Sequence, residues 1–455
     1  MRERLLGIPR FRSIVRLSTD DGKVHFDPLA RDEVDMEEHV RVMDGKGTFT
    51  QQDIHQLLSD DYLDDWCSSQ PLWRMVLVHN LADGRSLLLI TIDHAIGDGI
   101  GLLSLCLSLF DDDDTKEDEE KQSAPRLSSS SSTQTKQQLS WSHTAVAFLA
   151  GVYDGIVNTL LPELTADPLN HFMIPMDRLW DDCPGKTYAQ TRPIPVADFK
   201  VLKSKIAGAT LNDVIVSVIG RALQQYLTAA NNDNPSGQQN QQQKQQLRAK
   251  FAVNMRRGSE RTGVDVGNCA VIASFPFPID MRDPIEAVWS CKTRGDELKS
   301  SPAFALRHRL TDLLLDTVPA HVLAPKLIRN VNLNTCLLSN VKGPTNKASF
   351  AGYAVDDLHF VAQGSVGLYV GILTFAGKLH VTLTKDDRTT ADIEELRELI
   401  EQCYEELEDA LKDVDPEHPL EFDFVKPVSA RILEFLVYSC VVVAPVFLAT
   451  QYTKF

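Results

Sequence analysis

Hydrophobic residues recur along this chain with two different periods, which predict strands and helices respectively. Residues 75–78 and 86–92 are rich in β-branched and aliphatic side chains, and the turn-forming segment 82–85 separates them. This arrangement predicts a β-hairpin. In residues 210–227 the apolar side chains follow a helical spacing behind a polar start. A helix is therefore predicted there, with Thr210 or Asn212 as its N-cap.

The same two patterns extend over most of the chain. Helices are also predicted at residues 51–63, 100–110, 141–161 and 393–411, and strands at 249–255, 269–278, 335–341 and 368–384. Alternating strands and helices are typical of α/β proteins, and a hairpin at 368–384 makes the sheets mixed. Because 455 residues exceed one ordinary core, we expect either two domains or one large α/β unit.

Two segments interrupt the pattern because they contain few apolar residues. Residues 111–138 combine a run of acidic residues with a run of serines, and residues 231–246 are rich in glutamine and asparagine. Such segments bury too little apolar surface to offset the entropic cost of ordering. We predict a disordered surface insertion at 111–138 and a loop at 231–246.

The C-terminal segment has the opposite composition. Residues 435–452 contain no charged side chain and lie between Arg431 and Lys454. A helix that spans a bilayer needs about 20 mostly apolar residues. Pro445 would kink such a helix, which membrane helices tolerate. We therefore predict an apolar C-terminal helix that forms a membrane tail at 426–455, with a buried terminal helix as the alternative.

Charge and cysteine content narrow the class of protein. The net charge is −17, and the eight cysteines show no metal-binding or disulfide-like spacing. Nucleic-acid binding requires clustered Lys and Arg, so that class is excluded. An anionic substrate would need a local basic patch. The cysteines predict reduced thiols in a protein that faces the cytosol, and no metal site or secretory signal is expected.

Candidate chemistry lies directly after the predicted strand 86–92. The residues there include Asp93, His94, Gly97, Asp98 and Gly99. A neutral imidazole is suited to abstracting a proton from an alcohol, and glycines permit turns and a close approach of substrate to the backbone. Asp98 can fix the loop by bonding backbone N–H groups or a distant cation.

These residues alone leave several explanations open. His94 can be a structural histidine beside a turn, or a metal ligand together with Asp93 or Asp98, although no second ligand cluster is present. A Ser-His-Asp hydrolase is a third explanation, but the chain contains no G-x-S-x-G elbow. Asn212 and Gly343 likewise have ordinary explanations, as an N-cap and as part of a turn.

"HAIGDG" at 94–99 resembles the H-x-x-x-D-G signature of the coenzyme A-dependent acyltransferase superfamily. Further segments resemble the ordered motifs of the bifunctional wax ester synthase/diacylglycerol acyltransferase family: "PLW" at 71–73, "LNDVIVSVIGRAL" at 211–223, "VGN" at 266–268 and "LLSNVKGP" at 337–344. The resemblance extends over nearly the whole chain. It implies two chloramphenicol-acetyltransferase-like α/β sandwich domains with mixed sheets, which we assign to residues 1–190 and 191–425. His94 would lie at their interface, in a tunnel open to both faces.

The resemblance also implies a reaction and roles for residues. An O-acyltransferase of this kind moves a long-chain acyl group from acyl-CoA to a long-chain alcohol or diacylglycerol, without a metal or bound cofactor. His94 matches the general base, Asp98 a structural aspartate, and Asn212 a catalytic asparagine that can stabilise an oxyanion. Substrate-binding candidates are Asp93, Gly97, Gly99, Asp213, Asn268, Ser339, Asn340 and Gly343, and candidates for the CoA phosphates are Arg256, Arg257 and Lys342.

The chain also departs from the family pattern. Asp93 stands where members carry a first histidine, and a carboxylate there can alter the orientation of His94. Lys342 stands where proline is usual, and the chain begins where the family has a further N-terminal segment. Either the sequence is incomplete or the first domain forms without that element.

A membrane tail and lipid substrates predict a location at the endoplasmic reticulum membrane or on a lipid droplet, with the catalytic body in the cytosol. Two alternative functions stay open. One is an acyltransferase of the same fold with a small soluble acceptor, and the other is a catalytically silent, membrane-anchored scaffold.

Overall fold

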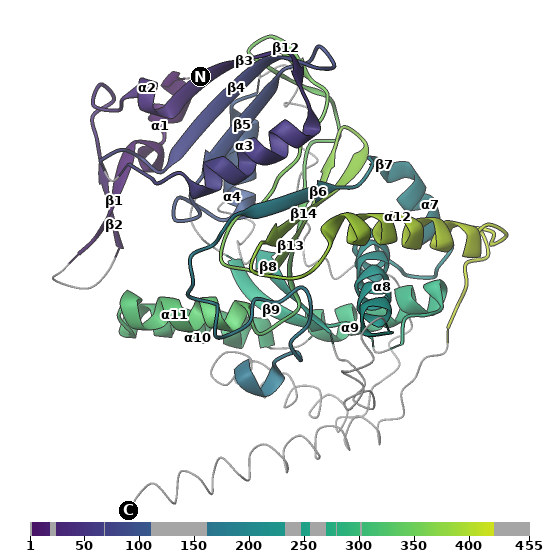
Figure 1. Cartoon of the computed structure of the whole chain (residues 1–455). Coiled ribbons are helices and arrows are strands. Elements are labelled where there is room, and N and C mark those ends of the chain that lie inside the picture. Colours follow the sequence, from purple (N-terminus) through teal and green to yellow (C-terminus); the bar gives the residue numbers. More distant parts are fainter. Residues whose placement is uncertain are drawn as a thin grey trace, which may run out of the picture.

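The computed structural model describes residues 2–18, 24–67, 69–110, 162–232, 247–254, 270–278, 280–300 and 303–422 (Figure 1). The predicted insertion 111–138, the helix 141–161, residues 233–246 of the predicted loop and the predicted tail 426–455 lie outside these ranges. Among the helices within them, none combines the length and the apolar character that crossing a bilayer requires.

The first half of the chain contains a three-stranded sheet. β4 (Trp73–Leu81) lies in its centre, parallel to β3 (Val40–Phe49) and antiparallel to β5 (Leu87–Ile92), so the predicted hairpin is confirmed. Apolar residues of β3 and β4 pack against α3 (Gln51–Leu63), and α4 (Gly99–Ser108) follows β5. Both helices had been predicted within two residues of these bounds.

The N-terminal segment packs against the same sheet. It consists of α1 (Arg2–Gly7), a 3-10 turn (Pro9–Arg12), the antiparallel strands β1 (Ser13–Leu17) and β2 (Val24–Pro28), and α2 (Met36–His39). Leucines of α1 and Phe11 join Trp73 and Met75 of β4 in one buried cluster. This packing fixes the N-terminal segment beside the strand that precedes the candidate loop.

The second half is built on a seven-stranded sheet in the order β6-β14-β13-β10-β8-β9, with β7 also paired to β14. Its strands are β6 (Lys186–Gln190), β7 (Ile194–Pro195), β8 (Arg248–Asn254), β9 (Ala270–Pro276), β10 (Cys336–Lys342), β13 (Leu368–Phe375) and β14 (Lys378–Asp386). β10 is parallel to β8 and β13, and the other pairs are antiparallel. The sheet is therefore mixed, as predicted.

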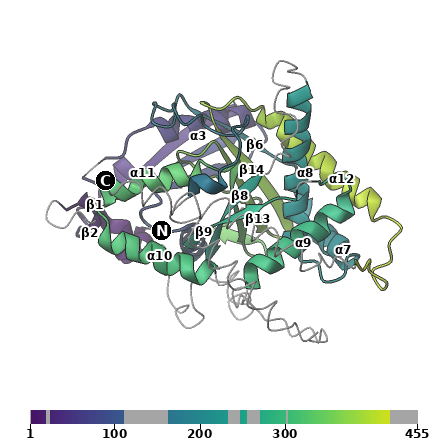
Figure 2. The same cartoon turned by 90° about the horizontal axis from the view of Figure 1, so that it is seen from below.

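Helices pack beside the large sheet. They are η2 (Pro162–Thr165), α7 (Val196–Ser204), α8 (Leu211–Asn232), α9 (Pro284–Ser300), α10 (Ala303–Thr317), α11 (Ala320–Val331) and α12 (Ile393–Ala410). Figures 1 and 2 show α8, α9 and α12 grouped together, with α10 and α11 at the other end of the sheet. The predicted helix at 393–411 is confirmed, and α8 buries the predicted apolar positions Val214, Ile215, Val218, Ile219, Leu223 and Leu227.

The two halves meet where α3 contacts β6. The N–H of Lys186 donates to Ser59 Oγ at 3.2 Å, and the carbonyl of Leu58 accepts from Tyr188 Oη at 3.4 Å and from Gln363 Nε2 at 2.9 Å. Because β6 pairs with β14, the last residues of the predicted range 1–190 hydrogen-bond into the large sheet. The domain division itself stays a prediction.

Buried charges lie beneath this contact. Asp386 at the end of β14 is fully buried, and its carboxylate accepts from Lys186 Nζ at 2.6 Å and from Arg388 Nη2 at 2.8 Å. The Lys186 ammonium also lies 4.7 Å from the ring centroid of Tyr62 in α3. Burial opposes ionisation, but the two cations outweigh it and hold the pKa of Asp386 below its usual range.

A second cluster joins the β4–β5 turn to the large sheet. Asp357 accepts from Lys378 Nζ at 2.9 Å and lies 3.4 Å from Arg85 Nη1 in that turn. His380 of β14 is 1% exposed, its Nε2 lies 3.8 Å from Asp357 Oδ1, and its ring contacts that of His359 with centroids 4.4 Å apart. Burial lowers the pKa of His380 below 6.5, although Asp357 acts in the opposite direction.

We expect His380 to make the fold sensitive to acid. Its pKa is lower in the folded chain than in the unfolded one, so the unfolded chain takes up the proton first, and stability falls as the pH drops below about 6.5. Urea unfolding at pH 7.5 and 5.0 should show a smaller loss at pH 5.0 for His380→Phe than for the wild type. The matched control is His418→Phe, an exposed histidine. An unchanged pH dependence in His380→Phe contradicts this account.

Candidate active site

The loop between β5 and α4 presents His94. The side chain of His94 is exposed, whereas Ile96 and Asp98 are buried. Asp98 is the N-cap of α4: its Oδ1 accepts a hydrogen bond from the N–H of Gly101 at 2.9 Å. Of the two predicted ways for Asp98 to fix the loop, bonding to backbone N–H groups is therefore observed, and an N-cap of this kind contributes about 1 kcal/mol to helix stability.

Asp93 closes the turn on the other side of His94. Its Oδ1 accepts from the N–H of Ala95 at 2.8 Å, and its carbonyl oxygen accepts from the N–H of Ile96 at 3.0 Å. The N–H of Asp93 donates to the carbonyl of Leu72 at 2.9 Å, which fixes the loop to the residue before β4. The carboxylate of Asp93 thus bonds the backbone immediately after His94.

Thr210 rather than Asn212 caps the long helix α8. Asp213 Oδ2 accepts from both the N–H and the hydroxyl of Thr210 at 2.8 Å, and the N–H of Asp213 donates back to Thr210 Oγ1 at 3.2 Å. This reciprocal arrangement is a capping box. Asp213, a predicted substrate-binding residue, is 2% exposed and stabilises the start of the helix.

Asn212 is not the N-cap, and its side chain forms a hydrogen bond with Asn340 instead. Nδ2 of Asn340, on β10, donates to Oδ1 of Asn212 at 3.0 Å, which joins two predicted site residues that lie 128 positions apart. The bond occupies the amide oxygen of Asn212 and orients its NH₂ group, the type of donor that an oxyanion requires.

The other candidates of the second half that the structure describes, Ser339, Lys342 and Gly343, lie on or beside β10. Ser339 hydrogen-bonds Tyr369 of β13, whose pKa burial raises to about 12 while the bond acts in the opposite direction. The N–H of Gly343 donates to the carbonyl of Thr374 at 2.9 Å, and a Cβ at Gly343 would lie 2.5 Å from that oxygen. Close packing against β13 therefore requires glycine at this position. Lys342 is exposed.

Replacing Gly99 or Gly343 with alanine should affect folding and activity in opposite ways. A Cβ added at Gly99 meets no atom within 4 Å, and alanine is favoured over glycine in a helix by up to about 1 kcal/mol. We expect Gly99→Ala to fold normally and to lose about tenfold or more in activity if substrate needs that space. Gly343→Ala should instead lower the free energy of unfolding by about 1–3 kcal/mol. Thermal unfolding and acyl transfer, measured for both variants, check this. Unchanged activity of Gly99→Ala would remove Gly99 from the binding site.

The candidate residues come from both halves of the chain, and α4 connects the halves. Phe110, just after α4, packs with Ala348 and with Phe375 of β13 in one apolar cluster. The helix that begins at the His94 loop is thus anchored at its other end on the strand beside β10. Asn268, Arg256 and Arg257 lie outside the described residues.

The sequence analysis did not identify one residue that contacts the His94 loop, Arg10. Arg10 Nη1 donates to the carbonyl oxygen of Ile96 at 3.2 Å and lies 3.5 Å from that of Ala95. The two partners are 85 and 86 positions away, and nothing in the pattern around Arg10 indicates the contact.

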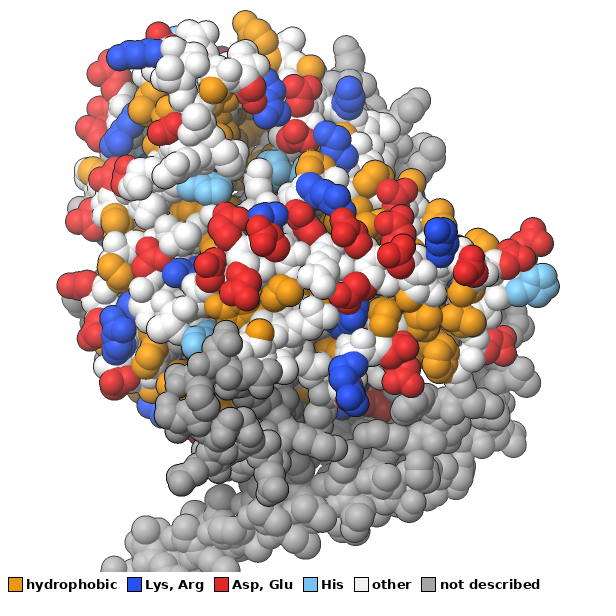
Figure 3. Space-filling view, turned by 45° about the vertical axis from the view of Figure 1, so that its right-hand side comes forward, with side chains coloured by type: hydrophobic (Ala, Val, Ile, Leu, Met, Phe, Trp, Pro, Cys, Tyr) orange, Lys and Arg blue, Asp and Glu red, His pale blue; other side chains and the backbone are white. Residues whose placement is uncertain are grey.

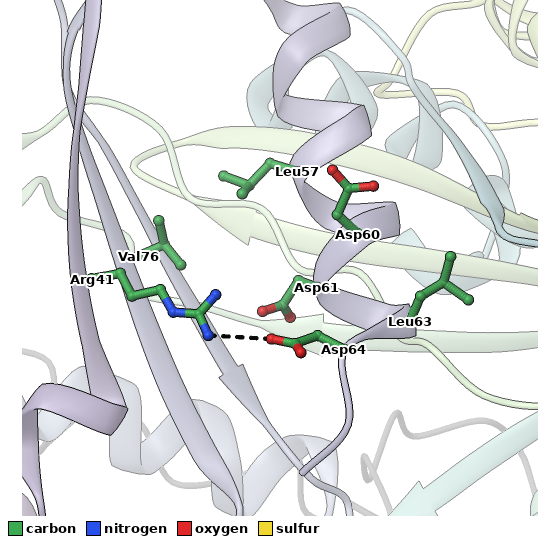
Figure 4. A pocket seen from close by; sticks show the side chains of 7 residues that line it. All are labelled: Arg41, Leu57, Asp60, Asp61, Leu63, Asp64 and Val76. Carbon is green, nitrogen blue, oxygen red and sulfur yellow. Dashed lines mark hydrogen bonds and ion pairs between the residues drawn. The ribbon is translucent and has the colours of Figure 1, made fainter. Parts of the chain in front are cut away.

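Two cavities in the described part of the chain lie away from the candidate residues. One, of about 420 Å³, lies between α3 and the β3–β4 pair, and the ion pair of Arg41 with Asp64 crosses it (Figure 4). The other, of about 250 Å³, is lined by residues 169–171, Met173, Pro175, Leu227 and residues 388–390. Neither is lined by His94 or Asn212.

Comparison with known proteins identifies the class. The wax ester synthase/diacylglycerol acyltransferase catalytic-domain model matches residues 2–215, and the C-terminal-domain model of the same family matches residues 266–408. Wax ester synthase/diacylglycerol acyltransferase 9 of Arabidopsis thaliana is 26% identical over 416 residues, which cover 83% of this chain and 82% of that protein.

Solved structures show the same fold. The wax ester synthase/diacylglycerol acyltransferase from Marinobacter aquaeolei VT8 is similar with a TM-score of 0.57 at 16% identity, covering 90% of this chain and 89% of that one. The first condensation domain of the calcium-dependent antibiotic synthetase has a TM-score of 0.54 at 12% identity, covering 91% and 86%.

The fold is therefore the two-domain α/β fold shared by condensation domains and acyltransferases, as predicted. The chain belongs to the wax ester synthase/diacylglycerol acyltransferase family, and it is an acyltransferase.

Proposed function

We propose that this chain transfers a long-chain acyl group from acyl-CoA to the hydroxyl group of a long-chain alcohol or diacylglycerol. The products are a wax ester or triacylglycerol, together with free CoA. The observation that carries the proposal is the exposed His94 on a loop fixed by Asp93 and Asp98, within a chain whose two halves both match this family.

In this mechanism His94 is the general base. Its imidazole takes the proton of the acceptor hydroxyl as the oxygen attacks the thioester carbonyl. The tetrahedral intermediate then collapses, the C–S bond breaks, and the imidazolium returns the proton to the CoA thiolate. General acid–base catalysis of this kind contributes about 10²–10⁴-fold to the rate.

Asn212 stabilises the charge that develops on the thioester oxygen. Its amide oxygen is held by Asn340 at 3.0 Å, so the NH₂ group has a fixed direction before substrate binds. One donor of this kind contributes about 2.7–4 kcal/mol to the transition state. Acyl-CoA is a substrate, and this mechanism uses no bound cofactor or metal.

Acyl-CoA carries several negative charges, and the protein has a net charge of −17. Figure 3 shows acidic side chains gathered on the face that carries α12, where Glu394, Glu398 and Glu405 are exposed. This face repels a polyanion. CoA therefore approaches elsewhere, and Lys342, exposed at the end of β10, is the described cation nearest in sequence to Asn340 and Gly343.

The lipid acceptor and product partition into membranes, so we place the enzyme on the endoplasmic reticulum membrane or a lipid droplet with its catalytic body in the cytosol. The apolar residues 435–452 support this location. Fractionation and carbonate extraction of the full chain, compared with a chain ending at residue 425, test it. A full chain that stays soluble contradicts the location.

The acceptor is tested with membranes from cells that express the full chain. Labelled palmitoyl-CoA is offered with hexadecanol, with diacylglycerol, or with a small soluble alcohol. Ester from either lipid acceptor supports the proposal, and the ratio of the two products gives the preference. Ester from the small alcohol alone favours a soluble acceptor. Failure to bind or consume palmitoyl-CoA favours a silent scaffold.

A further inference from the structure

A side chain from the N-terminal segment holds the backbone of the loop that presents His94. Nη1 of Arg10 donates to the carbonyl oxygen of Ile96 at 3.2 Å and lies 3.5 Å from the carbonyl oxygen of Ala95. These carbonyls belong to the two residues that follow His94. A guanidinium group is planar and always charged, so it can hold neighbouring acceptors in one geometry.

Arg10 is itself held in place. Its guanidinium carbon lies 4.4 Å from the ring centroid of Phe26 on β2, so the group has an aromatic face on one side and the loop carbonyls as its partners. The turn Pro9–Arg12 that carries it is fixed to β4, because Nε1 of Trp73 donates to the carbonyl oxygen of Phe11 at 2.8 Å. Trp73 and Phe11 are at most 1% exposed.

We propose that Arg10 is a positioning residue for His94. By holding the carbonyls of Ala95 and Ile96, it fixes the backbone direction from which the imidazole extends. Asp93 and Asp98 fix the two ends of the same loop from within it. Arg10 acts from outside the loop. The inference rests on the proposed function, in which His94 is the base.

The loss of the Arg10 contacts should change the placement of His94 without disrupting the fold around it. The bonds of Asp93 to Ala95 and of Asp98 to Gly101 do not involve Arg10. In a variant without the Arg10 guanidinium, the hydrogen bonds at the end of β5 and at the start of α4 remain. Only the short segment after His94 then becomes more mobile. A displacement of about 1 Å at a catalytic group can cost about 100-fold in rate. Substrate binding is affected much less, since Arg10 contacts the loop backbone.

The test compares three arginine variants in the full chain. Arg10→Ala should lower kcat for palmitoyl-CoA and hexadecanol by about 10- to 100-fold, with KM within about twofold of the wild type. Arg10→Lys should recover part of this loss, because an ammonium can still donate to one carbonyl. Arg16→Ala is the control. Arg16 lies on β1, its side chain is 67% exposed, and its Nε lies 3.3 Å from Oδ2 of Asp27.

The outcomes are distinct. An active wild type whose Arg10→Ala variant has unchanged kcat overturns this inference alone. Equal losses in Arg10→Ala and Arg10→Lys also overturn it. A wild type that transfers no acyl group overturns the proposed function and this inference with it.

If Arg10→Ala does not fold, Phe26→Leu decides the matter. That variant removes the aromatic face but keeps the arginine and its charge. A fall in kcat with unchanged KM supports positioning, and an unchanged kcat contradicts it.

Discussion

Replacing His94 with alanine is expected to lower kcat for acyl transfer by about 10²–10⁴-fold, because the reaction loses the group that moves the proton in both steps. The side chain is exposed, so the free energy of unfolding should change by less than about 0.5 kcal/mol. Purified His94→Ala and wild type are compared in initial rates and in thermal unfolding. His94→Gln, which keeps a polar side chain of similar length, should be nearly as inactive.

The activity that remains in His94→Ala distinguishes a general base from a structural histidine. Activity of His94→Ala within about threefold of the wild type contradicts a general base at this position, since such catalysis contributes at least about 100-fold. A loss of activity that comes with a loss of folding instead supports the structural explanation of the histidine.

The largest expected effect on stability comes from Asp386→Asn. The change leaves Lys186 and Arg388 buried without their counterion, and breaking one partner of a buried ion pair costs about 3–5 kcal/mol. Asn has nearly the same shape, so packing is retained. Urea unfolding followed by tryptophan fluorescence measures the difference.

A neighbouring carboxylate provides the control. Asp387 is partly exposed and accepts from Thr187 Oγ1 at 2.6 Å, and Asp387→Asn should cost no more than about 1 kcal/mol. Equal unfolding midpoints for the two variants would contradict a stabilising role of the buried ion pairs. A larger loss in Asp386→Asn supports that role.

Elements with a strong local pattern were predictable from the sequence. The hairpin of β4 and β5, the helix α3 and the amphipathic helix α12 appear within a few residues of their predicted bounds. Their apolar spacing is set by neighbours in the sequence, which pattern analysis can detect. The helices α10 and α11 were not singled out. Apolar side chains such as Leu313 and Leu315 of α10 and Leu327 of α11 are exposed at 57%, 55% and 40%, so burial does not follow the apolar positions there.

Contacts between distant segments were not predictable. The pair of Lys186 with Asp386 joins residues 200 positions apart, and the contact of Arg10 with the loop joins residues 85 and 86 positions apart. No local spacing encodes either. The N-cap of α8 shows an intermediate case: Thr210 and Asn212 were both suitable, and the capping box with Asp213 selects Thr210.

For the candidate site, the residue types were predicted from the sequence, and the structure adds contacts that the sequence did not indicate. Asp98 bonds the backbone at the start of α4, and Asn212 meets Asn340. The roles of His94 and Asn212 in chemistry stay predictions. Asp213 and Gly343, predicted to bind substrate, have contacts that explain them by helix capping and by strand packing.

The most direct test of the central claim is formation of labelled ester from labelled palmitoyl-CoA by the full chain, with hexadecanol or diacylglycerol as acceptor. We predict ester that requires both substrates and disappears in His94→Ala. Release of CoA with palmitate but no ester, or equal ester from the wild type and His94→Ala, would contradict the account.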